Sequence, residues 1–180
     1  MANLCSFLMK VRGHKDDIEK FCKAIQQEGN IWMGRGAEVD IEFEDDDLVC
    51  LRGTCKWSIQ SALIDNAISM RTNPNRWHWG DGVDREHLEF ITLYEACERW
   101  RLVMEVYSEE CGCQFQEHFI CDKGDDICHD CVSWEEYWLD DYETKEEAEE
   151  DLDVKFTDEE WENRDDRITR GGFENWDFEI

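Results

Sequence analysis

Two stretches of the chain, residues 3–12 and 37–45, alternate apolar and polar side chains. The apolar positions are Cys5, Phe7, Met9 and Val11 in the first stretch and Val39, Ile41 and Phe43 in the second. Successive side chains of a strand point to opposite faces, so each stretch predicts a β-strand with one buried face. In the second stretch the other face carries Asp40, Glu42 and Glu44, and we expect that face to be exposed and anionic.

Two other stretches, residues 15–28 and 84–100, repeat apolar residues with the period of an α-helix. Positions i, i+3, i+4 and i+7 are Ile18, Phe21, Cys22 and Ile25 in one and Phe90, Leu93, Tyr94 and Cys97 in the other. Each stretch therefore predicts an amphipathic helix. Asp16 and Asp17 suit the first turn of the first helix, and Gly29 is a typical stop after its end.

The remaining patterns complete a mixed α and β order. They predict strands at 47–57, 101–107, 114–121 and 126–132, a short helix at 58–70, a loop at 71–84 and helical segments at 144–152 and 157–167. The order strand–helix–strand–strand–helix–strand is typical of the ferredoxin-like fold. We therefore expect an α+β protein whose antiparallel sheet carries helices on one face, with an extra β-hairpin. We expect a ferredoxin-like domain at 1–133 with an insertion at 59–87, and an acidic helical extension at 134–180.

The net charge of −27 comes from 46 acidic and 19 basic residues. Residues 134–180 alone hold 20 acidic and 5 basic residues, a net of −15. A surface this anionic repels nucleic acid and anionic membranes, so the favoured partners are basic proteins or cations. No apolar run is long enough to span a membrane, and the first residues do not form a signal-peptide pattern. We expect a cytoplasmic protein whose ten cysteines are reduced or metal-bound.

Half of those cysteines lie between residues 111 and 131, in the segment CGCQFQEHFICDKGDDICHDC. Thiolate and imidazole groups at such spacing suit tetrahedral zinc. The candidate ligands of a structural zinc ion are Cys128, Cys131, Cys121 and His118. The alternative is that these cysteines are small buried apolar residues.

The predicted hairpin gives this zinc hypothesis a geometric test. A regular turn centred at residues 124–125 would place Cys121 opposite Cys128 and His118 opposite Cys131. The four ligands would then be divided between the two faces of the hairpin. A single zinc ion would require Cys128 and Cys131 to leave the regular ladder together.

Three segments resemble the YubB-type ferredoxin-like domain family of phage and plasmid proteins. The matching residues are Asn3, Cys5, Val11, Gly13, Asp17 and Phe21 in the first segment, Thr54, Trp57 and Ser58 in the second, and the run ITLYEACERWRLVMEVYSEECGCQFQ in the third. Leu4 stands where the family usually has Trp, and the prolines that usually follow the second segment are missing. The resemblance implies a ferredoxin-like fold and an origin in a mobile genetic element, and it carries over no catalytic residue.

The acidic segment suggests a function when it is combined with that implied origin. Carboxylates held on a folded surface can imitate the phosphates of a nucleic acid and occupy the basic groove of a nuclease, with aromatic side chains as anchors. We therefore expect an anti-CRISPR or anti-restriction protein that acts in the cytoplasm of the host cell. The residues predicted to bind this partner are Glu135, Glu136, Trp138, Asp140, Asp141, Glu146, Glu147, Glu149, Glu150, Asp158, Glu159 and Trp161.

Two alternatives belong to other classes of protein. One is a small accessory protein stabilised by zinc and without inhibitory activity. The other is a Mg²⁺-dependent enzyme, which would need a concave cluster of carboxylates. The sequence contains no GxSxG, HExxH, P-loop or GxGxxG motif, so we expect that the protein is not an enzyme.

Overall fold

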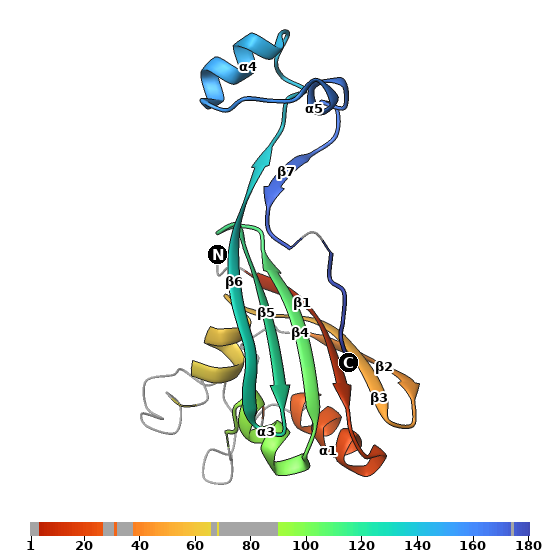
Figure 1. The fold of residues 1–180 in the computed structure, drawn as a ribbon. Helices are drawn as coiled ribbons and strands as arrows, with labels where there is room; N and C mark the ends of the chain where they lie inside the picture. The colour runs from red at the N-terminus through yellow and green to blue at the C-terminus, as the bar shows by residue number, and fades with distance from the viewer. Residues whose placement is uncertain (1–3, 27–30, 32–37, 66–67, 69–89, 174) are drawn as a thin grey trace.

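The structure is a computed structural model that describes residues 4–26, 31, 38–65, 68, 90–173 and 175–180. Figure 1 shows the ribbon, with its elements labelled along the chain. These elements are β1 (Leu4–Arg12), α1 (Lys15–Gln26), β2 (Val39–Asp45), β3 (Leu48–Lys56), the π-helix η1 (Gln60–Asp65), α3 (Leu93–Trp100), β4 (Val103–Glu110), β5 (Phe115–Asp122), β6 (Asp125–Tyr137), α4 (Lys145–Leu152), α5 (Asp158–Glu162) and β7 (Ile168–Gly171).

Within the described residues, seven strands form one open antiparallel sheet in the order β2-β3-β1-β4-β5-β6-β7. The predicted α+β class and antiparallel sheet are therefore confirmed. The predicted loop at 71–84 lies outside the described residues, as does most of the predicted insertion at 59–87. None of the described helices is long and apolar enough to cross a membrane.

The alternating strand patterns explain which face of the sheet is buried. β1 buries its four predicted apolar residues, whereas Phe43 on β2 is 50% exposed although the pattern predicts it to be buried. The difference arises because β2 is an edge strand, with a neighbouring strand on one side only. A buried face therefore needs cover from neighbouring elements as well as an alternating pattern.

The two predicted amphipathic helices form, but the second is shorter than its pattern. α1 buries its predicted face, including Phe21 and Ile25. α3 begins at Leu93, so Phe90 precedes the helix, although it is buried. The Thr92 side chain accepts a hydrogen bond from the Glu95 amide, and the Glu95 side chain accepts one from the Thr92 amide. This reciprocal cap fixes the start of the helix, and periodicity alone does not reveal it.

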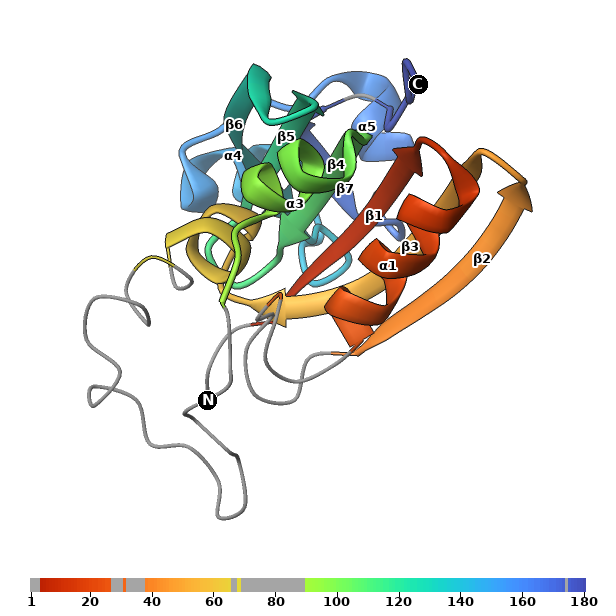
Figure 2. The ribbon, with the colours of Figure 1, turned by 90° about the horizontal axis from the view of Figure 1, so that it is seen from below.

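α1 and α3 lie on the same face of the sheet and enclose the main hydrophobic core with it (Figure 2). Phe21 and Ile18 of α1 pack in this core with side chains of the central strands, such as Met9 and Leu51. Full burial of one such side chain stabilises the fold by about 1.5–3 kcal/mol. The main core therefore joins residues from both halves of the sheet.

The tail, defined here as residues 173 and 175–180, covers the part of the other face of the sheet around β4 and β5. On β4, Met104 and Val106 pack in the main core, so Glu105 and Tyr107 point to the opposite face. The Tyr107 hydroxyl donates a hydrogen bond to the Asp177 carbonyl oxygen at 3.2 Å. The rings of Phe173, Trp176 and Phe178 surround the Tyr107 ring. The tail thereby shields polar groups that would otherwise lie on an open sheet face.

β6 carries the chain across the predicted domain boundary at 133–134 and pairs with β7 beyond it. The predicted acidic helical extension therefore includes the end of a strand, two short helices and another strand. We call residues 137–168 the acidic lobe. Figure 1 shows this lobe, with α4 and α5, beyond the ends of β1 to β5.

Candidate functional site

The acidic lobe has a small hydrophobic core of its own. The buried members are Leu139, Ala148, Phe156 and Ile168. Partly buried side chains pack around them: Tyr137, Tyr142, Leu152, Val154 and Trp161. Because these apolar residues recur between the acids, the lobe can fold as a defined surface despite its charge. The aromatic residues of this segment thus serve partly as core.

Threonine residues cap both helices of the acidic lobe. Thr144 Oγ1 accepts a hydrogen bond from the Glu147 amide at 3.3 Å at the start of α4. Thr157 Oγ1 accepts one from the Glu160 amide at 3.1 Å, and Glu160 Oε2 accepts one from the Thr157 amide at 2.7 Å. A cap of this kind stabilises a helix by about 1 kcal/mol. Acids in the first turn also interact favourably with the helix dipole, so the local sequence tolerates their density there.

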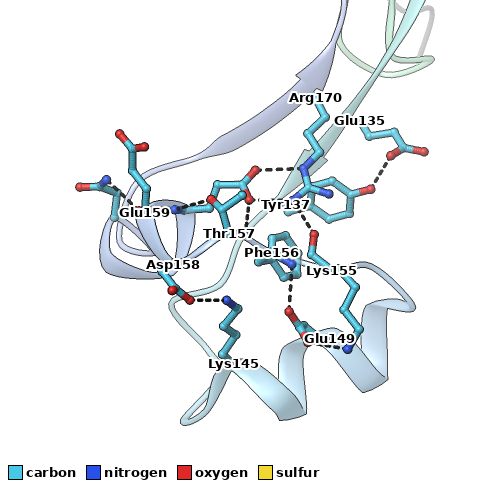
Figure 3. A network of polar contacts seen from close by, with 12 residues as sticks. Glu135, Tyr137, Lys145, Glu149, Lys155, Phe156, Thr157, Asp158, Glu159 and Arg170 are labelled. Atoms are coloured by element: carbon cyan, nitrogen blue, oxygen red, sulfur yellow. Dashed lines mark hydrogen bonds and ion pairs between the residues drawn. The ribbon is translucent and has the colours of Figure 1, made fainter.

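Arg170 of β7 links the sheet to the lobe, as Figure 3 shows. Its guanidinium donates to both carboxylate oxygens of Glu160, at 3.0 and 2.8 Å, and to the Lys155 carbonyl oxygen at 2.8 Å. It also lies over the rings of Tyr137 and Phe156, 5.6 and 5.0 Å from their centroids. The hydrogen bonds from Arg170 lower the pKa of Glu160 to about 2. This contact fixes α5 against the end of the sheet.

The residues predicted to bind a partner differ in their exposure. Trp138 is 54% exposed, and most of the predicted acids are exposed too. The exposed acids of the predicted set are Glu135, Asp140, Asp141, Glu146, Glu147, Glu150, Asp158 and Glu159. Glu136, Glu149 and Trp161 are only partly exposed.

Some of these side chains are already occupied by structural contacts. Glu149 binds Lys155 at 2.6 Å, and its other oxygen accepts the Phe156 amide at 3.0 Å. Asp158 binds Lys145 at 2.8 Å. Trp161 packs on the small core. The structure thus separates the predicted set into residues that hold the lobe together and residues that face outward.

The hairpin of β5 and β6 does not have the register predicted for it. A β-bulge between Ile120 and Cys121 places Cys121 opposite Asp126 and Ile120 opposite Cys128. His118 then lies opposite Asp130. The prediction that His118 and Cys128 lie on different faces is wrong, because one extra residue in β6 reverses the alternation beyond the bulge. Cys128 also stays within the strand, so it need not leave the ladder to approach His118.

The bulge brings His118, Cys128 and Asp130 together on the face covered by the tail. Cys128 Sγ lies 3.8 Å from His118 Nδ1 and 3.3 Å from Asp130 Oδ2. One donor atom from each residue lies within 4.8 Å of the other two. Burial raises the pKa of the Cys128 thiol to about 11, and the Asp130 carboxylate contributes to the rise. The group is a possible metal site made of one nitrogen, one sulfur and one oxygen donor.

The other two predicted ligands lie elsewhere. Cys121 is buried in the main core next to Cys97. Cys131 is opposite Glu117 and lines a cavity of about 740 Å³ with residues that include Trp57 and His129. The structure therefore keeps His118 and Cys128 together and does not bring Cys121 or Cys131 to them.

Two residues of the cluster were missed by sequence reasoning. Asp130 lies within the CHDC segment, where the spacing of the thiols gives no signal for a carboxylate ligand. Glu105 is fully buried, and its Oε1 lies 2.9 Å from His118 Nε2. A signal was present in the sequence: an acid in the middle of the otherwise apolar strand LVMEVY needs a specific partner.

The Mg²⁺-enzyme alternative predicts a concave group of carboxylates. In the described part of the chain, the group able to hold a metal is His118, Cys128 and Asp130, which contains one carboxylate. Hard oxygen ligands suit Mg²⁺, whereas a thiolate and an imidazole suit zinc and similar ions. A hollow beside β2 is lined by Glu19, Asp45, Asp46 and Asp47, but these acids do not form a metal-holding group of that kind, and Lys15 binds Asp46 at 2.6 Å. The Mg²⁺ alternative stays a prediction.

Comparison with known proteins adds no assignment. No protein-family model matches the chain, and no curated protein or solved structure matches it at a significant level. The resemblance to the YubB-type family stays a prediction from the residues quoted above. Functional inference for this chain therefore depends on its own surface and side-chain chemistry.

Proposed function

We propose that this protein binds a basic, nucleic-acid-binding protein and blocks the groove that nucleic acid would occupy. The acidic lobe is the binding surface. One observation carries the proposal: a lobe with its own core and capped helices presents mainly outward-facing carboxylates. Such a surface differs from a flexible acidic tail because its charges are fixed before binding.

Fixed charges matter for the strength of this interaction. A pre-ordered surface loses less conformational entropy on binding than a disordered one. Carboxylates entering a basic groove replace the phosphates there and compete with DNA or RNA directly. The exposed Trp138 indole lies among these acids, and its Nε1 donates to Glu136 Oε1 at 2.6 Å. We assign it the role of an apolar anchor within the charged surface.

The proposed target class is a CRISPR effector or restriction nuclease in the cytoplasm of a host cell. The resemblance to a family of phage and plasmid proteins supports this class, because mobile elements need to evade such nucleases. The same resemblance supports a ferredoxin-like assignment for β1 to β4 with α1 and α3. The strand order β2-β3-β1-β4 and the placement of both helices on one face agree with that assignment.

A competition assay tests the proposal. Purified effectors and nucleases are titrated with the protein in the presence of fluorescently labelled target DNA, and displacement is followed by anisotropy. We expect displacement that weakens steeply as salt rises. If the protein and the DNA bind the same target together, groove blocking is wrong.

Two matched variants separate the lobe from overall charge. The lobe variant carries D140N, D141N, E150Q and E159Q, and the control carries D40N, E42Q, D45N and D47N on or beside β2. All eight residues are exposed, and each variant removes four charges. We expect the lobe variant to lose affinity by about tenfold or more and the control by much less. Equal losses would mean that net charge, not the lobe, drives binding.

A zinc-stabilised accessory protein is the second candidate. The proximity of His118, Cys128 and Asp130 favours it. Elemental analysis of protein purified without a histidine tag tests it, and a metal-to-protein ratio near zero with unchanged melting in chelator would eliminate it. Zinc binding by itself is compatible with groove blocking, because the cluster lies on the sheet and not in the acidic lobe. The accessory-protein candidate differs in that it predicts no displacement of DNA in the competition assay.

A further inference from the structure

We propose that His118, Cys128 and Asp130 form an open, three-ligand site for a divalent transition-metal ion, with zinc as the best match. The inference is independent of the acidic lobe. It gives the zinc-stabilised candidate a ligand set in which His118 and Cys128 were predicted from the sequence and Asp130 was not. The ligands come from the neighbouring strands β5 and β6 and share one face of the sheet.

The separations between donor atoms fit a tetrahedral ion. Zinc lies about 2.3 Å from sulfur and about 2.0–2.1 Å from nitrogen or oxygen, so tetrahedral ligand atoms are about 3.5 Å apart. The observed separations from Cys128 Sγ are 3.8 Å to His118 Nδ1 and 3.3 Å to Asp130 Oδ2. The third separation, between the donor atoms of His118 and Asp130, is within 4.8 Å, so side-chain rotation is what would bring the three donors onto one ion.

The imidazole of His118 is held in the orientation that metal binding needs. Its Nε2 faces the Glu105 carboxylate at 2.9 Å, which leaves the Nδ1 lone pair for the metal. The other Glu105 oxygen accepts the amides of Glu179 and Ile180, at 2.6 and 3.2 Å. The Tyr107 ring stacks on the imidazole with centroids 4.0 Å apart.

The buried carboxylate of Glu105 behind the imidazole also points to a metal ligand at His118. Glu105 is fully buried, and a carboxyl group in such a place needs hydrogen bonds to its oxygens. A buried carboxylate on the far nitrogen of a histidine is the usual second layer of a zinc site. The tail, by holding Glu105, becomes part of the metal site although it supplies no ligand.

The same residues could also be taken for a nucleophilic thiol with a histidine base and an acid behind it. Asp130 argues against this use, because its carboxylate lies 3.3 Å from the sulfur and opposes a free thiolate. A metal cation removes that conflict, since it binds both groups. Asp130 is exposed, so solvent can reach the fourth position, as in zinc sites that bind water or an exogenous ligand.

Cobalt substitution tests the site directly. Apo-protein without a histidine tag is titrated with Co²⁺, which reports thiolate ligation by an ultraviolet charge-transfer band and tetrahedral geometry by its visible bands. We expect one Co²⁺ per chain, with both signals lost when Zn²⁺ is added. A ratio near zero would overturn the proposal.

Paired variants identify the ligands. C128S is expected to abolish the thiolate band, and its control C131S to retain it. D130N is expected to weaken binding at least tenfold, and its control D125N to leave it unchanged. Glu105→Gln is expected to weaken binding by about 10–100-fold while the stoichiometry and the thiolate band persist, as for a positioning residue.

The controls also decide between ligand sets. Loss of the thiolate band in C131S, or its survival in C128S, would show that the ligands are not those proposed here. Circular dichroism of each variant establishes that it is folded. Because Asp130 and Asp125 are exposed, their substitution leaves the core untouched and keeps the test valid.

Discussion

The sheet and the acidic lobe are stabilised in different ways. The sheet encloses a large core between its strands and two helices, with large side chains such as Phe21 and Phe119 fully buried. The lobe has four buried side chains and adds helix caps, ion pairs and the Arg170 contact. The stabilisation that comes from buried apolar area depends weakly on salt and pH, whereas the stabilisation that comes from ion pairs depends strongly on both. The lobe should therefore be the part of the molecule whose order responds to solution conditions.

The largest expected effect is in the main core. Phe21→Ala should lower the free energy of unfolding by about 3–5 kcal/mol, because it leaves a cavity beneath α1. Chemical denaturation followed by circular dichroism measures the change. A loss below about 1 kcal/mol would mean that the main core is loosely packed and that the contrast with the lobe is false.

The next effect is local to the lobe. Phe156→Ala removes the central ring of the small core and should unfold α4 and α5 while the sheet remains folded. Hydrogen exchange measured by mass spectrometry should show lost protection at 145–162 and unchanged protection at β1 and β3. Equal loss in both regions would show that the lobe and the sheet unfold as one unit.

A smaller effect concerns the Glu160–Arg170 contact. Glu160 has a pKa lowered from 4.5 to about 2, so the contact stabilises the fold above pH 4.5 and this contribution disappears as the pH falls toward 2. Glu160→Gln should cost about 1 kcal/mol at neutral pH, since the pair is partly screened by solvent. The difference from wild type should shrink below pH 4.5. Glu159→Gln, at an exposed neighbour, is the control and should change little.

The smallest effect is expected for an exposed ion pair between α1 and the turn that joins β2 to β3. Lys15 lies 2.6 Å from Asp46, and both side chains are mostly exposed. Lys15→Ala should change the free energy of unfolding by less than about 0.5 kcal/mol. A larger change would indicate that charge contributes to the sheet as it does to the lobe. Thermal unfolding of the wild type and the variant, each in low and in high salt, measures the change.

The local patterns predicted much of the sheet. Cys5, Phe7, Met9 and Val11 alternate in the sequence and are buried in β1, because neighbours on both sides and helices above leave only one arrangement for an apolar face. α1 follows its apolar stripe for the same reason. α3 starts later than its stripe because the cap at Thr92, not periodicity, sets its first turn.

The sequence predicted the acidic surface better than it predicted the metal site. The exposed acids from Asp140 to Glu159 could be selected from the sequence because charged side chains need contact with water. Some of these acids instead form ion pairs within the lobe, as Glu149 does with Lys155. Such a pair depends on a basic side chain that comes near only in the folded chain. The thiol cluster was predicted with the wrong register, because a β-bulge is decided by packing on both sides of the hairpin.

The sequence by itself determined the anionic character, the α+β class and the apolar faces of β1 and α1, since these follow from charge count and short-range periodicity. The tertiary structure decided the surroundings of His118. Glu105, Cys128 and the tail are separated from it along the chain, and they meet only after the bulge sets the register of β6 and the tail folds over β4. Contacts of this kind depend on the relative placement of strands, and no local pattern encodes that placement.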